Sequence, residues 1–164
     1  MEQAGPQATD TGTAGVIARP PFLFLAALLL GFVWDRLLPL PFPVPGTDLV
    51  HWILGAALSL IGLALALAGI RNFSQAGTPV HTNMPTRALV TTGIHGWTRN
   101  PIYLGLFLVY GGIGVASQSL WVLMITLPLA ITTRYGVVAR EEAYLEGRFG
   151  DAYRDYKARV RRWL

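Results

Sequence analysis

The sequence predicts an all-α integral membrane protein with about four transmembrane helices and a C-terminal amphipathic helix at the membrane interface. Of the 164 residues, 52% are hydrophobic and only 13% are charged, against about 25% charged in a soluble domain. The charges are also missing from whole stretches of the chain. Such a stretch crosses the hydrocarbon core when it reaches roughly 20 apolar residues.

Four apolar stretches are the expected spans. The third is short, and only three residues separate it from the fourth, so these two should form a tight helical hairpin. The first is followed by alternate prolines, which cannot continue a helix. The four stretches cover residues 21–38, 49–70, 102–116 and 120–138.

The chain divides into a tail, two helices and a larger unit. Residues 1–18 are polar and small, with no basic segment and no clear cleavage site, which favours a disordered tail over a removed signal peptide. Residues 19–75 hold the first two spans. Residues 76–164 hold a loop, the last two spans and the amphipathic tail. The length allows no second sizeable core.

The basic residues predict the orientation. If the N-terminus is cytoplasmic, every arginine and lysine except Arg36 lies at the cytoplasmic side. We therefore expect both termini to be cytoplasmic, in a bacterial inner membrane. The basic tail could bind nucleic acid, but beside membrane spans it more often meets anionic lipid, so we predict the bilayer as partner and no nucleic acid. Because the chain has no cysteine, thiolate chemistry is excluded and we predict no metal site.

Small residues line one face of the second span, where they let helices approach closely in lipid. This face also permits a homodimer. Its members are Gly55, Ser59, Gly62, Ala66 and Gly69.

The first polar cluster lies where the third span begins. Pro101 suits the first turn of a helix, and Asn100 is then a natural N-cap. The helix start favours an anionic group, and Arg99 adds a planar donor for a carboxylate. Tyr103 lies just inside the span. An ordinary interfacial belt with a capped helix explains the cluster equally well.

The second polar cluster lies where the fourth span ends, at Arg140, Glu141 and Glu142. The hairpin returns it to the depth of Asn100. Donors and carboxylates would then face one pocket, as a zwitterionic, cationic ligand such as S-adenosylmethionine requires. The tail that follows is amphipathic, with Leu145, Phe149, Tyr153, Tyr156, Val160 and Trp163 at helical spacing. It should be kinked near Gly150, where Asp151 can cap a fresh helix, and cover this pocket.

These residues also carry a family resemblance. The run Arg99-Asn100-Pro101-Ile102-Tyr103-Leu104-Gly105, followed by Glu141-Glu142, resembles the Arg-His-Pro-x-Tyr-x-Gly…Glu-Glu signature of isoprenylcysteine carboxyl methyltransferases and their phospholipid methyltransferase relatives. The similarity covers roughly residues 76–163, so residues 76–164 would be a methyltransferase core. Asn100 replaces the usual histidine, and His95 stands where the best-known members have tyrosine.

The resemblance implies an S-adenosylmethionine site between the last two spans. Together with Arg99, the positions expected to contact this cofactor are Arg87, Ala88, Leu89, Val90, His95, Asn100, Pro101, Ile102, Tyr103 and Glu141.

The expected reaction is methyl transfer to a lipid-like or prenylated acceptor at the cytoplasmic face, with carboxyl O-methylation first among the options. A carboxylate acceptor is already ionised and needs only orientation, for which Arg140 and Arg134 are candidates. An amine or thiol acceptor would need a base, and His95 or Glu142 could serve.

Two other classes of protein remain open. A scaffold or transporter subunit could reuse the fold, although the first three spans carry no charge that would line a path. A membrane reductase would bind nicotinamide instead.

Overall fold

The protein is described here by a computed structural model for residues 15–78 and 86–164, and within that part of the chain all the regular secondary structure is helical. Four long helices follow one another along the chain, and each runs in the direction opposite to the one before it. They are α1 (Pro20–Leu37), α2 (Asp48–Gln75), α3 (Pro101–Ala116) and α4 (Leu120–Thr133). A short 3₁₀ helix, η1 (Gly93–Gly96), precedes α3. Beyond α4 come a π-helical turn, η2 (Arg134–Val138), and then α5 (Ala139–Phe149) and α6 (Asp151–Arg159). Most of the predicted tail, residues 1–14, falls outside the described residues.

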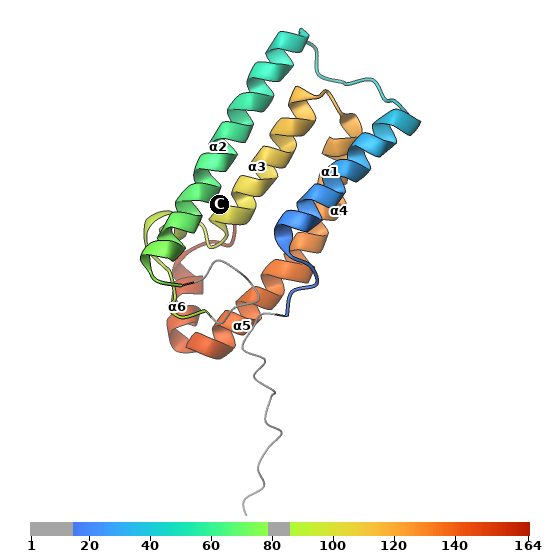
Figure 1. Cartoon of the computed structure of the whole chain (residues 1–164). Helices are drawn as coiled ribbons and strands as arrows, with labels where there is room; N and C mark the ends of the chain where they lie inside the picture. The colour runs from blue at the N-terminus through green and yellow to red at the C-terminus, as the bar shows by residue number, and fades with distance from the viewer. Residues whose placement is uncertain (1–14, 79–85) are drawn as a thin grey trace, which may run out of the picture.

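Figure 1 shows that α5, α6, the start of α1 and the end of α2 gather at one end of the bundle. We call this the polar end, because η1 and the basic C-terminal segment also lie there. The even number of long helices brings the first described residues and the C-terminus to this same end.

The prediction of an all-α membrane protein is confirmed. Three helical segments of the described chain are long and apolar enough to cross a membrane: Pro20–Leu37, Asp48–Gln75 and Leu120–Phe149. The fourth apolar helix, Pro101–Ala116, is shorter. The helix expected to end near Ile70 continues to Gln75, because nothing in residues 71–75 breaks it and Gly77, with φ of +62°, follows it.

The predicted hairpin of α3 and α4 is also confirmed. Its turn consists of residues 117–119, and Gln118 adopts a left-handed φ of +52° so that the chain can reverse so quickly. The Ser119 hydroxyl then caps α4 by accepting from the N–H of Val122 at 3.0 Å.

Helix α3 nevertheless packs most extensively on α2. The contact is backbone to backbone: a Cβ added to Gly62 would lie 2.6 Å from the carbonyl oxygen of Gly105, and one added to Gly55 would lie 2.6 Å from the backbone nitrogen of Ala116. At Gly69 the close neighbours are side-chain atoms, with an added Cβ 2.7 Å from Cγ1 of Ile102. The small-residue face of α2 is therefore occupied by α3, so it offers no free surface for the homodimer that the sequence pattern permitted.

The second helix pair is α1 with α4. Phe24, Tyr110, Val122 and Leu129 form a buried cluster between α1, α3 and α4. At the end of the bundle away from the polar end, the rings of Trp34 and Trp121 stack with centroids 5.3 Å apart.

The C-terminal segment differs from its prediction in two ways. Gly150, at φ +54°, kinks the chain as expected, but it is Gly150 that occupies the N-cap of α6, and Asp151 is the first helical residue. The helix then ends at Arg159, so Val160 and Trp163 do not continue the amphipathic stripe. Val160 is extended, and Trp163 packs against Tyr103 and Val138 instead.

Candidate functional site

The start of α3 is tied to the C-terminal segment. Pro101 occupies the first turn as predicted, but the Asn100 side chain makes no capping hydrogen bond. Its Nδ2 donates to the carbonyl oxygen of Arg162 at 3.0 Å, and the hydroxyl of Thr98 donates to the same oxygen at 3.2 Å. Asn100 therefore occupies the N-cap position as predicted, but its side chain does not cap the helix. The first N–H groups of α3 have no side-chain cap in the described part of the chain, which leaves them available to an anion.

Glu142 joins three segments by ion pairs. Its Oε1 lies 3.1 Å from the guanidinium of Arg99, and both of its oxygens accept from Arg162, at 2.9 and 2.5 Å. The side chains of Arg99 and Glu142 are only 8% and 11% exposed. Because both carboxylate oxygens are engaged, Glu142 acts here as a cross-link between α5, the α3 start and the C-terminal segment.

Arg99 keeps one unused donor. Its guanidinium also donates to the carbonyl oxygen of Lys157 at 3.4 Å. Its Nε is buried and has no hydrogen-bond partner among the described residues. A buried, unpaired N–H costs free energy unless a ligand satisfies it.

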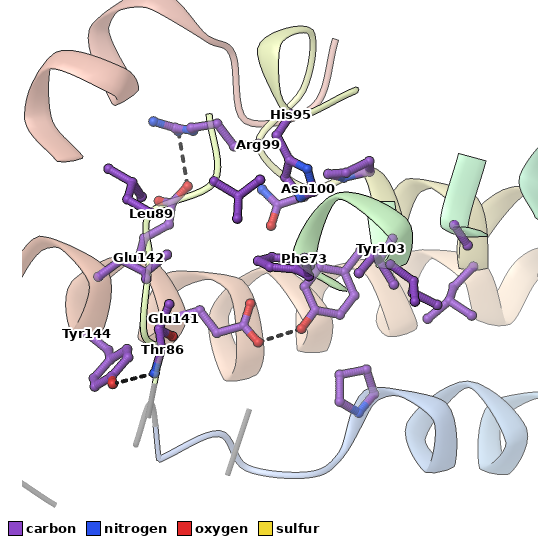
Figure 2. Close-up of a pocket in the computed structure, with 18 of the residues that line it drawn as sticks. Phe73, Thr86, Leu89, His95, Arg99, Asn100, Tyr103, Glu141, Glu142 and Tyr144 are labelled. Atoms are coloured by element: carbon purple, nitrogen blue, oxygen red, sulfur yellow. Dashed lines mark hydrogen bonds and ion pairs between the residues drawn. The ribbon is translucent and has the colours of Figure 1, made fainter. Parts of the chain in front are cut away.

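Glu141 points away from this network, toward α3. Figure 2 shows its carboxylate facing the ring of Tyr103, whose hydroxyl donates to Oε1 at 2.5 Å. The second oxygen of Glu141 has no hydrogen-bond partner among residues 15–78 and 86–164, so it is available to accept from a ligand.

His95, in η1, is held in a fixed orientation and is uncharged. Its carbonyl oxygen accepts from the hydroxyl of Tyr156 at 2.7 Å, and its Nδ1 lies 3.4 Å from Nδ2 of Asn72. The ring of Phe73 packs edge-on, with centroids 4.8 Å apart. Burial lowers the pKa of His95 to about 4, so the ring is neutral at physiological pH.

These side chains surround a cavity of about 650 Å³ at the polar end, within the size range of small-molecule sites. Of the residues expected to contact a cofactor, all except Arg87 line it: Ala88, Leu89, Val90, His95, Arg99, Asn100, Pro101, Ile102, Tyr103 and Glu141. Glu142 lines it too.

Three predicted site residues lie elsewhere. Arg87 is not a lining residue, and its backbone N–H donates to the hydroxyl of Thr78 at 2.8 Å. Arg140 donates to the carbonyl oxygen of Gly15 at 2.9 Å, and Arg134 lies over the ring of Tyr135, 5.5 Å from its centroid. Neither of these two arginines lines the cavity.

The cavity also has two walls that were not predicted, one from the start of α1 and one from the middle and end of α2. A third wall, from α5 and α6, agrees with the expected cover by the amphipathic tail. No local motif marks the α1 and α2 walls, whereas the tyrosines of the tail belonged to the amphipathic stripe that was expected to cover the pocket. The added residues include Arg19, Phe22, Leu63, Leu67, Ile70, Phe73, Tyr144, Tyr153 and Tyr156.

The lining fits S-adenosylmethionine in its chemistry. The unpaired Nε of Arg99 and the uncapped start of α3 suit a carboxylate, and the free oxygen of Glu141 suits an ammonium or a hydroxyl. Neutral His95 and Phe73 offer flat surfaces for an aromatic ring. The described residues contain no group of side chains that could hold a metal ion.

The fold and the cavity define a helical membrane protein with a cavity of small-molecule size at the ends of its spanning helices. A family model described as "Phospholipid methyltransferase" matches residues 50–152, which is 103 of the 164 residues. The chain belongs to this family, as the sequence resemblance predicted. The matched region runs from the third residue of α2 through α5 and contains most of the cavity lining.

One similar protein comes from Haemophilus influenzae and is described as an uncharacterized protein. It is 70% identical over 27 residues, which is 16% of this chain and 43% of that protein. The chain therefore matches less than half the length of this relative. No solved structure matches the chain.

Proposed function

We propose that the protein is an S-adenosylmethionine-dependent methyltransferase that acts on a lipid-like or prenylated acceptor at the membrane interface. The observation that carries this proposal is the composition of the cavity. The same cavity is lined by anion-binding donors, by a carboxylate with an available oxygen, and by apolar side chains of α1 and α2. Membership of the phospholipid methyltransferase family supports the same activity.

Bound there, the cofactor would supply an electrophilic methyl group on a sulfonium. Arg99, Asn100 and the start of α3 would hold its carboxylate, and Glu141 would accept from its ammonium or hydroxyl groups. Tyr103 holds Glu141 by their 2.5 Å hydrogen bond, so the accepting oxygen is fixed before the ligand arrives. Such orientation is the main contribution that a protein makes to a simple displacement reaction. For well-aligned reactants it can lower the activation free energy by about 7–11 kcal/mol.

Carboxyl O-methylation is the first candidate for the acceptor chemistry. A carboxylate acceptor needs no general base. The cavity offers few side chains that could act as one, because Glu142 is paired with Arg99 and Arg162. Methylation of an amine or thiol is the alternative. With Glu141 assigned to the cofactor and Glu142 paired with two arginines, the neutral ring of His95 is the group that could then take a proton.

Isothermal titration in detergent tests the cofactor. S-adenosylmethionine and S-adenosylhomocysteine should both bind, and NADPH should not. Incubation with methyl-labelled cofactor and either prenylated cysteine analogues or membrane lipid extract then tests transfer. If NADPH binds and neither S-adenosylmethionine nor S-adenosylhomocysteine does, the methyltransferase proposal is refuted and a reductase is favoured.

A further inference from the structure

Asn72, in the last turn of α2, has its amide oriented by two contacts. Its Nδ2 donates to the carbonyl oxygen of Thr92 at 2.8 Å and lies 3.4 Å from Nδ1 of His95. A carbonyl oxygen can only accept, so the amide group that faces Thr92 is the NH₂ group and not the oxygen. The contact with Thr92 therefore places a donor beside Nδ1 of His95.

The surroundings keep Asn72 and His95 in this arrangement. Gly93 lies in η1 with φ of +60°, and a Cβ added to it would collide with the amide of Asn72. The ring of His95 packs edge-on against Phe73, at an interplanar angle of 71°. Tyr156 holds the backbone of His95 by donating to its carbonyl oxygen at 2.7 Å. The ring therefore has little freedom to turn its Nδ1 away from Asn72.

A ring nitrogen that faces a donor must be unprotonated. A neutral imidazole carries one proton, so with Nδ1 as the acceptor that proton is on Nε2. Burial keeps the ring of His95 neutral. Nε2 has no hydrogen-bond partner among residues 15–78 and 86–164, and His95 lines the cavity. The ring therefore presents a free N–H to a ligand in that cavity.

We propose that Asn72 is a positioning residue that fixes His95 in the Nε2–H tautomer, so that His95 donates a hydrogen bond to the bound ligand and does not act as a base. The ligand atom that it meets is then an acceptor, such as a ring nitrogen or a hydroxyl oxygen of S-adenosylmethionine. The tautomer is independent of the proposed function, whereas the identity of this ligand rests on it. Methylation of an amine or a thiol loses its candidate base, because the unprotonated Nδ1 faces Asn72.

NMR of ¹⁵N-labelled histidine rings tests the tautomer without any ligand, because protonated and unprotonated ring nitrogens have widely separated chemical shifts. The chain contains three histidines, and the signals lost in His95→Gln are those of His95. In the parent protein, in detergent at neutral pH, Nε2 should be protonated and Nδ1 unprotonated. A protonated Nδ1 would overturn the proposal.

Variants of Asn72 test its part in the choice of tautomer. Asn72→Asp replaces the donor with an acceptor and should move the proton of His95 to Nδ1. Asn72→Ala removes the donor without adding a charge and should give chemical shifts averaged over both tautomers. The matched control is Gln75→Glu, which adds the same charge to the same turn of α2 at an exposed residue and should leave the signals of His95 unchanged. Parent-like signals in both Asn72 variants would show that Asn72 only supports the fold, and would overturn the proposal.

Titration with S-adenosylhomocysteine tests the donor role. Asn72→Asp should bind it about tenfold or more weakly than the parent protein, because an unprotonated Nε2 then faces the acceptor atom of the ligand. Gln75→Glu should bind it within about twofold of the parent, since an exposed charge is screened. An Asn72→Asp variant with the proton on Nδ1 and unchanged affinity would overturn the donor role. If the parent protein does not bind S-adenosylhomocysteine at all, the proposed function fails, and the spectrum of the unliganded protein still decides the tautomer.

Discussion

Neutralising Glu142 should release the C-terminal segment from the bundle. Glu142→Gln leaves two guanidiniums, those of Arg99 and Arg162, without their carboxylate. Removing one partner from a buried ion pair typically costs about 3–5 kcal/mol. Arg162 is 27% exposed and recovers some hydration, so we expect the lower value, about 3 kcal/mol.

A cost of this size raises the population of the detached tail about 100-fold, because each 1.4 kcal/mol is a factor of about ten. Limited trypsin digestion measures that population, since Arg154, Lys157 and Arg159 become cleavable when α6 opens. If α6 opens and closes much faster than trypsin cleaves it, the digestion rate is proportional to the equilibrium population of the detached tail.

Glu146→Gln is the matched control. Glu146 lies one turn further along α5 and pairs with Lys157 at 2.7 Å, but on the surface, where such pairs contribute about 0–1 kcal/mol. Its variant should change the digestion rate less than about fivefold. The double variant Glu142→Gln with Arg162→Gln should cost less than the sum of the single ones. Equal digestion of the Glu142→Gln and Glu146→Gln variants would refute the cross-link.

Four further predictions concern topology, the cofactor, helix packing and pH. A reporter active only outside the cytoplasm should give no signal when fused to Leu164, and a strong signal would contradict the predicted orientation. Glu141→Gln should weaken S-adenosylmethionine binding at least about tenfold in titration with little change in melting temperature; the reverse outcome would make Glu141 structural. Gly62→Val should lower the melting temperature in detergent far more than Gly111→Val, because an added Cβ meets the backbone of Gly105 only at position 62. Burial holds the pKa of His95 at about 4 while an unfolded histidine titrates near 6.5, so the unfolded state binds more protons between these values and stability should fall as pH drops from 6.5 toward 4. His95→Gln should lose less stability between pH 7 and pH 5 than the parent protein, measured by thermal unfolding at both values.

The parts of the site that could be predicted are those that depend on short motifs in the sequence. Asn100-Pro101 marked a helix start, and a three-residue connection between α3 and α4 implied an antiparallel pair, so Glu141 could be placed opposite Tyr103. The α1 wall could not be predicted in this way. Arg19 reaches the cavity only because α1 packs beside α4, and no local pattern dictates which spans are neighbours.

The misplaced arginines have a different cause. Arg134 and Arg140 were chosen for their place near the end of the fourth span, without regard to which face of the helix they occupy. The continuation of α4 passes through the π turn Arg134–Val138. Such a turn inserts an extra residue and rotates everything after it, by about 100° in an α-helical frame. Arg140 therefore faces Gly15, while Glu141 faces the cavity. The residues Arg-Tyr-Gly-Val-Val contain no sequence signal that predicts the change from an α-helix to a π-helix.

The glycine contacts of α2 also restrict how this protein can change length. Gly55, Gly62 and Gly69 recur every seventh residue, and each meets the backbone or first side-chain atoms of the α3 region. Inserting one residue between any two of them would turn one half of the helix by about 100°, bringing a side chain to a place where no side chain fits. Insertions and deletions in α2 are therefore compatible with the fold only in steps close to seven residues, or beyond the glycines altogether. Adaptation to a thicker or thinner bilayer must take place in α1, in α4 or in the flanking segments.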